Sequence, residues 1–125
     1  MRRRGFTLIE LMLAIVLLTV VLTGVARYTG QYLHAVTTST TRTAAAQIAT
    51  EQVELVKADP SYLTLPAQWD GTQTGFPGYP AMTRLTTVSR ITGNTPPRDY
   101  TVVTVQVSEP TMGAPVNLTT VVGRP

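Results

Sequence analysis

The chain has 125 residues and no cysteine, which excludes disulfide bonds, thiolate metal sites and a cysteine nucleophile. Its formal net charge of +3 rests on Arg2, Arg3 and Arg4, because basic and acidic side chains are equal in number after residue 5. No basic patch interleaved with aromatic residues remains, so nucleic-acid binding is not expected. A chain of this length makes at most one modest domain with a small core.

Residues 6–26 form an apolar run whose only ionisable side chain is that of Glu10. At about 1.5 Å per helical residue, the run is long enough to cross a hydrocarbon layer of about 30 Å. The arginines before it predict a cytoplasmic amino end and an exported segment over residues 27–125. A cleavable secretory signal would be shorter and would end in an Ala-x-Ala type of site. We therefore predict a transmembrane helix.

Glu10 is the unusual residue in this run, because an ionised acid in the apolar layer is costly unless a positive group meets it. No Lys or Arg lies within residues 6–26. A cut between Gly5 and Phe6 would create an α-amino group four residues before Glu10. Within one helix the amine and the carboxylate lie at different depths, whereas staggered neighbouring subunits can bring the amine of one to the acid of the next.

The stretch "RGFTLIE", followed by an apolar helix, resembles the class III leader of type IV pilins and of type II secretion pseudopilins over residues 2–26. The resemblance implies that a prepilin peptidase cuts after Gly5 and that Phe6 is then N-methylated. It makes Arg2, Arg3 and Arg4 the basic leader, and it places the family's acid on Glu10, which recruits and registers the subunit. Gly5 also suits a peptidase that threads extended backbone, because glycine allows close approach and unusual dihedral angles.

Residues 27–58 are predicted to continue the helix as an amphipathic segment, which Asp59 and Pro60 end because proline disfavours helix in the residue before it. The segment from residue 37 to 43 is rich in β-branched residues and admits two readings, a solvated linker or a continuous helix. At 100° per residue one face of the later part is apolar and its opposite face polar. The predicted buried face comprises Ala45, Ile48, Ala49, Gln52, Leu55 and Val56.

Residues 59–125 are predicted to form a small β head. Residues 61–80 indicate an irregular connector, anchored on the head by Trp69, Phe76 and Tyr79. Three strands are expected at residues 82–91, 100–108 and 116–122, separated by glycine- and proline-containing turns. The predicted fold is α+β, with the long amino-terminal helix packed on an antiparallel sheet of about three strands, which agrees with the pilin architecture.

No catalytic constellation is visible, because the single histidine, His34, has no nucleophile or acid at a telling spacing. The acids Asp59, Asp70, Asp99 and Glu109 are too scattered for a calcium loop. We therefore expect no enzyme activity, no cofactor and no metal. The expected domains are a cleaved leader (1–5), a transmembrane and filament-core helix (6–26), its amphipathic continuation (27–58) and a periplasmic head (59–125).

The leading hypothesis is a structural subunit of the inner membrane that assembles into a type IV pilus-type filament. Its implied partners are the prepilin peptidase, other pilin or pseudopilin subunits and an inner-membrane assembly platform. The short head without a cysteine pair resembles a minor pilin, which would help to initiate assembly. One alternative is a minor pseudopilin of a type II secretion system. Another is a bitopic membrane-anchored ligand-binding protein, which would keep residues 1–5.

Overall fold

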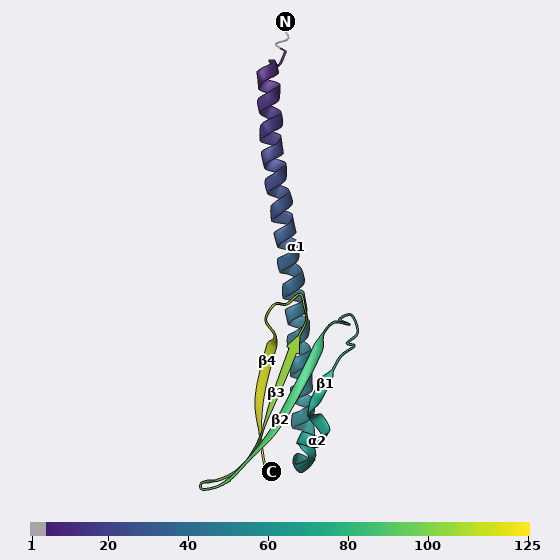
Figure 1. Cartoon of the computed structure of the whole chain (residues 1–125), viewed down its shortest axis with the longest axis vertical. Helices are drawn as coiled ribbons and strands as arrows, with labels where there is room; N and C mark the ends of the chain where they lie inside the picture. Colours follow the sequence, from purple (N-terminus) through teal and green to yellow (C-terminus); the bar gives the residue numbers. More distant parts are fainter. Residues whose placement is uncertain (1–4) are drawn as a thin grey trace. The chain divides into compact units, whose positions relative to one another are not determined.

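The computed structural model describes residues 5–125, so Arg2, Arg3 and Arg4 lie outside the described residues. The chain divides into two compact units, with the boundary between Thr37 and Thr38. One helix, α1, contributes residues to both units, and every other element lies in the second unit (Figure 1). The elements are α1 (Leu8–Ala58), the 3-10 helix η1 (Tyr62–Thr64), α2 (Leu65–Trp69), β1 (Gly71–Gln73), β2 (Thr83–Asn94), β3 (Pro97–Ser108) and β4 (Val116–Gly123).

Helix α1 runs without interruption through residues 37–43, so the segment is helix and not a linker. The β-branched threonines of α1 are accommodated because their hydroxyls donate to the carbonyl oxygen four residues earlier. These bonds measure 2.8 to 3.0 Å and involve Thr19, Thr23, Thr29, Thr37, Thr43 and Thr50. The hydroxyl groups thus have acceptors within the helix itself.

The second half of α1 packs one face against the sheet, as the amphipathic pattern predicts. The buried residues of this face are Thr41, Ala45, Ala49, Gln52, Val53 and Val56. Two positions correct the prediction: Leu55 is 48% exposed, whereas Val53, which the predicted face omitted, is only 5% exposed. The reason is angular, because Leu55 projects about 100° away from the centre of the buried face while Val53 lies inside it.

The end of α1 is tied to the connector by Asp59. Its Oδ1 accepts the backbone N–H of Ser61 at 2.8 Å, and its Oδ2 accepts the Trp69 indole N–H at 2.8 Å. These hydrogen bonds, with Ser61 first, lower the pKa of the Asp59 carboxyl. Trp69 packs partly buried against the core, as predicted, and so do Phe76 and Tyr79.

The segment predicted as an irregular connector holds three short elements, η1, α2 and β1. Pro66 stands in the first turn of α2, where its missing N–H costs no hydrogen bond. Each of these elements is five residues or shorter, and none has the periodicity that would reveal it in the sequence.

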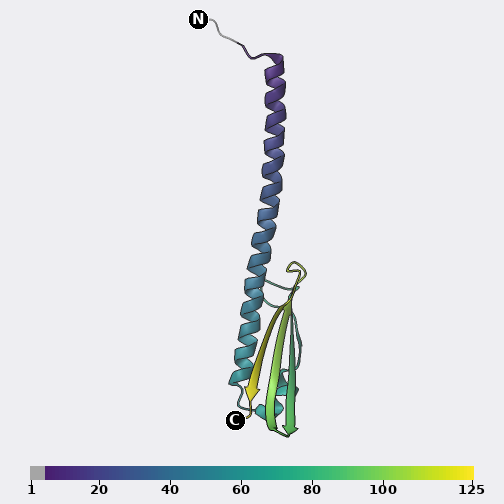
Figure 2. The same cartoon turned by 90° about the vertical axis from the view of Figure 1, so that its left-hand side faces the viewer.

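The sheet is antiparallel throughout, with strand order β1-β2-β3-β4. The three predicted strands are present as β2, β3 and β4, and β1 adds a fourth at the edge of β2. The β2–β3 hairpin is long, with pairing from Thr83 with Ser108 to Asn94 with Pro97. Figure 2 shows this sheet lying along one side of the later part of α1. The predicted α+β class and the packing of helix on sheet are confirmed.

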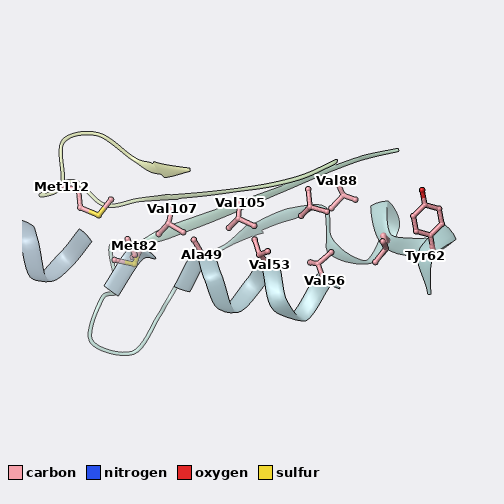
Figure 3. Close-up of a cluster of buried hydrophobic side chains, with 12 residues drawn as sticks. Ala49, Val53, Val56, Tyr62, Met82, Val88, Val105, Val107 and Met112 are labelled. Atoms are coloured by element: carbon pink, nitrogen blue, oxygen red, sulfur yellow. The ribbon is translucent and has the colours of Figure 1, made fainter. Parts of the chain in front are cut away.

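The core lies between this sheet and α1. Val103, Val105 and Val107 of β3 are fully buried and face the helix, as their alternation predicts. Figure 3 shows Ala49 and Val53 of α1 close to the β3 side chains. The remaining buried members come from the connectors and from β2: Tyr62, Leu65, Met82, Val88 and Met112.

The apolar alternation of β2 is imperfect because a charged residue, Arg84, occupies one of its inward positions. Its side chain is buried there, with only 8% exposed. Its Nη1 donates to the Ile48 carbonyl oxygen at 3.3 Å and its Nη2 donates to Gln73 Oε1. The guanidinium also lies 5.0 Å from the centre of the Phe76 ring. Burial lowers the pKa of Arg84, and the nearby Glu51 opposes this effect.

Asp99 joins the far end of the sheet to the connector. Its Oδ1 accepts the Tyr62 hydroxyl and the Arg90 Nε–H, each at 2.9 Å. Its Oδ2 accepts Arg90 Nη2 at 2.6 Å and Arg124 Nη1 at 3.3 Å. The hydrogen bonds from Arg90 are the main reason that the pKa of Asp99 lies well below its ordinary value of 3.8.

This arrangement predicts that the second unit loses stability in acid. Because the folded-state pKa of Asp99 is depressed, its contribution is fully present above the unfolded-state pKa of about 4 and is lost as the pH falls further. Asp99→Asn should lower the thermal midpoint at neutral pH and flatten its dependence on pH below about 4. The measurement is thermal unfolding of the full chain in detergent, followed by the fluorescence of Trp69, the only tryptophan.

Glu54→Gln is the matched control, since the pair of Glu54 with Lys57 is solvent-exposed and contributes little. Its acid profile should follow that of the wild type. Equal acid profiles for Asp99→Asn and the wild type would contradict the assignment.

Candidate assembly site

The first turn of α1 is set by Thr7. Residues 5–7 are not helical, and α1 begins at Leu8. The Glu10 backbone N–H donates to Thr7 Oγ1 at 3.3 Å, and the Leu11 N–H donates to the Thr7 carbonyl oxygen at 3.1 Å. Thr7 is thus the N-cap, and Glu10 stands three residues after it. The spacing is that of a capping box, a helix-start signal that is readable in the sequence itself.

Gly5 and Phe6 precede the cap in non-helical backbone. A Cβ added to Gly5 would meet nothing within 4 Å, so packing within the described chain does not require glycine there. The Phe6 side chain is exposed. The predicted cleavage position therefore lies beside residues that are outside α1 and exposed.

Glu10 lies in the first turn of α1, where the positive end of the helix dipole favours a carboxylate. The side chain is exposed, and within residues 5–125 its carboxylate has no hydrogen-bond or ion-pair partner. A mostly apolar depression lies beside it, lined by Phe6, Glu10, Leu11, Leu13, Ala14 and Leu17. The structure thus places a carboxylate at the rim of an apolar surface. It does not bring a positive group of the described chain to it.

The first half of α1 exposes its apolar side chains on every side, from Leu8 to Val25. By length and composition, α1 is the one helix of the described residues that could cross a membrane, and nothing in its most apolar window is buried. Arg27, Tyr28 and Tyr32 follow the apolar run. Tyrosines at such positions are typical of the membrane–water interface, and they are a second signal that is readable in the sequence.

Between residues 5 and 125, no three His, Cys, Asp or Glu side chains lie together in a way that could hold a metal ion. His34 is exposed on α1. The features that stand out are therefore the capped first turn, the unpaired acid and the exposed apolar helix.

Residues 1–26 match a family model described as the prokaryotic N-terminal methylation motif. The chain carries a class III prepilin leader. The prepilin motif supports a processed subunit of the type IV pilin or pseudopilin kind, and it indicates a structural role. It also implies processing by prepilin peptidase and assembly with other pilin subunits, and together with the apolar helix it fits a membrane-anchored pilin. No curated protein and no solved structure matched the chain.

Proposed function

We propose that this chain is a minor pilin-like subunit, cut between Gly5 and Phe6, methylated on Phe6 and assembled into a type IV pilus-type filament. The observation that carries the proposal is the prepilin motif over residues 1–26, which coincides with a helix whose apolar side chains are exposed all round. A helix that is apolar all round needs a membrane or other helices to cover it. A filament core supplies the second kind of cover.

The proposed cleavage leaves the first turn of α1 intact. Cutting after Gly5 leaves Phe6 as the new amino terminus, one residue before the Thr7 cap. The helix is therefore kept whole, because its first hydrogen bond runs from Leu11 to Thr7. Arg2, Arg3 and Arg4 would leave with the leader after holding the amino end in the cytoplasm.

The assembly step pairs Glu10 of one subunit with the methylated Phe6 amine of its neighbour. The carboxylate is exposed and has no partner in the described chain, so a second subunit can reach it. In an apolar environment an unpaired acid is costly, and the pair removes this cost for both charges. Because the two groups lie four residues apart in sequence, their pairing also fixes the axial offset between adjacent helices.

The chain is proposed to contain four segments, in this order. Residues 1–5 are the leader, 6–26 the membrane and filament-core helix, 27–58 its amphipathic continuation, and 59–125 the periplasmic head. Arg27 and the two tyrosines after it support a far membrane boundary near residue 26. Before assembly, the subunit resides in the inner membrane with its amino end cytoplasmic. The assembly platform then inserts it into the filament.

The absence of a cysteine pair, which resembles a minor pilin, supports a minor subunit that initiates assembly. The test compares filaments sheared from cells that have the prepilin peptidase with those from cells that lack it. The chain should appear in the sheared fraction only with the peptidase, and at few copies per filament. Its presence in a secretion-system fibre, with none in pili, would instead identify it as a minor pseudopilin. Retention in the membrane whenever peptidase and platform are both active would contradict the proposal.

A further inference from the structure

One edge of the sheet is open along its whole length. β4 is the last strand in the order β1-β2-β3-β4, so only β3 lies beside it among the described residues. Its pairing with β3 covers every residue of the strand, from Val116 to Gly123. The other side of β4 therefore presents unpaired backbone groups along an eight-residue edge.

The register identifies which backbone groups point outward. Beyond the last pair of the ladder, the Arg124 N–H donates to the Asp99 carbonyl oxygen at 3.3 Å. In antiparallel pairing, hydrogen-bonded pairs alternate with pairs that exchange no hydrogen bonds. The even-numbered residues of β4 therefore bond to β3, and the odd-numbered ones direct N–H and C=O to the open edge. These outward residues are Asn117, Thr119, Val121 and Gly123.

On the opposite side of the sheet, the first part of β2 is covered. β1 pairs with β2 at residues 84–86, and α2 contacts β2. Where the β1 ladder stops, the Val88 N–H donates to Asp70 Oδ1 at 3.2 Å. A short strand, a side-chain acceptor and a helix thus protect the β2 edge over this stretch, whereas nothing of the described chain protects β4.

The composition of β4 fits a strand that is meant to be paired. Edge strands that must stay free usually carry charges, prolines or bulges. β4 has no charged residue and no proline, and its pairing with β3 is regular. A neighbouring strand would therefore meet no charged side chain that could repel it. No charge on β4 would lose its hydration when the two strands pair.

The inward side of β4 is also incompletely covered. Its apolar inward residues, Val116, Leu118 and Val122, pack against the core but are only partly buried. The inward valines of the adjacent strand β3 are fully buried. A further strand with an apolar residue at every second position would extend this inner face and cover the row.

We infer that the open edge of β4 receives an extended strand from a neighbouring subunit, uncharged over the contact and apolar at alternate residues. Backbone hydrogen bonds to Asn117, Thr119 and Val121 supply the attachment, and the half-covered inward row supplies selectivity. The source of the strand rests on the proposed function, which brings other subunits beside the chain; the edge itself does not depend on it.

The test uses the full chain in native membranes. Because the chain has no cysteine, Asn117→Cys places a single thiol at the edge, and benzophenone maleimide labels this thiol. On irradiation the benzophenone inserts into a C–H bond of the segment beside it, so the partner needs no thiol. Ser89→Cys is the control on the same exposed face. Asn117→Cys should give adducts whose linked peptide is an extended strand of another subunit. The mass of the adduct tells a second copy of this chain from a different subunit.

Two edge variants then test the geometry. Val121→Pro removes an outward N–H without removing a bond to β3, and Val121→Lys places a charge at the edge. Ser89→Lys is matched to the second variant, because Ser89 lies in the same cross-strand row, with Val102 between it and Val121. Both Val121 variants should abolish the Asn117→Cys adduct, and Ser89→Lys should preserve it. Trp69 fluorescence confirms that each variant is folded.

The inference is overturned if folded Asn117→Cys chains that have entered filaments form no adduct, or if adducts persist at wild-type yield in both Val121 variants. Adducts that map outside any extended segment also overturn it. A chain that keeps residues 1–5 in the presence of the peptidase refutes the proposed function instead, whatever the adducts show.

Discussion

Glu10→Ala is expected to abolish incorporation into filaments while leaving membrane insertion and cleavage after Gly5 largely intact. The substitution leaves the apolar run longer and more apolar, so insertion does not suffer. It removes the partner of the neighbouring Phe6 amine, and a charge left unpaired in an apolar interface costs about 3–5 kcal/mol. Incorporation should therefore fall by at least about a hundredfold. The measurement is the ratio of chain in sheared filaments to chain in membranes.

Glu10→Gln and Glu54→Ala are the controls for this prediction. Glu10→Gln keeps the shape of the side chain and should fail as Glu10→Ala does, because the charge is what pairs with the amine. Glu54 is an exposed acid on the later part of α1, so Glu54→Ala should incorporate normally. Normal incorporation of Glu10→Ala would refute the ion-pair mechanism.

Gly5→Val is expected to block removal of the leader. The fold places no requirement on this position, since a Cβ at Gly5 would meet nothing within 4 Å. The need for glycine therefore arises in the peptidase, where the absence of a side chain lets the backbone approach closely and adopt unusual dihedral angles. A β-branched residue should slow cleavage by at least about tenfold, or about 1.4 kcal/mol of transition-state stabilisation.

Gly24→Ala is a matched control, because a Cβ at Gly24 also meets nothing within 4 Å in the described chain. It lies within the helix, where alanine is favoured over glycine, and it should be processed at the wild-type rate. The assay follows the loss of the leader by mass in cells that contain the peptidase. Cleavage of Gly5→Val at the wild-type rate would contradict the assigned site.

The sequence predicted best the features that depend on long regular patterns. The apolar run before Arg27 predicted a helix, and α1 is long and apolar enough there to cross a membrane. Strict alternation in β3 placed Val103, Val105 and Val107 in the core. The helix continues through residues 37–43 despite poor propensities, because threonine hydroxyls find acceptors one turn earlier and the later residues pack on the sheet.

Features that depend on contacts between distant segments were less predictable. Arg84 is buried because Gln73, the Ile48 carbonyl and the Phe76 ring meet it, and none of these contacts follows from its neighbours in sequence. β1 exists because the edge of β2 pairs with it, not because its own three residues favour a strand. The cap at Thr7 is predictable from the sequence, since Thr-x-x-Glu before an apolar run is a recognised helix start.

The proposed membrane and filament roles both depend on processing of this chain as a prepilin. The most direct test is the intact mass and amino-terminal sequence of the protein from membranes of cells with and without a prepilin peptidase. We predict a chain that begins at N-methylated Phe6 when the peptidase is present and that retains residues 2–5 when it is absent. A chain that retains Arg2 to Gly5 in both would contradict it, because Glu10 would then lack the amine proposed to pair with it.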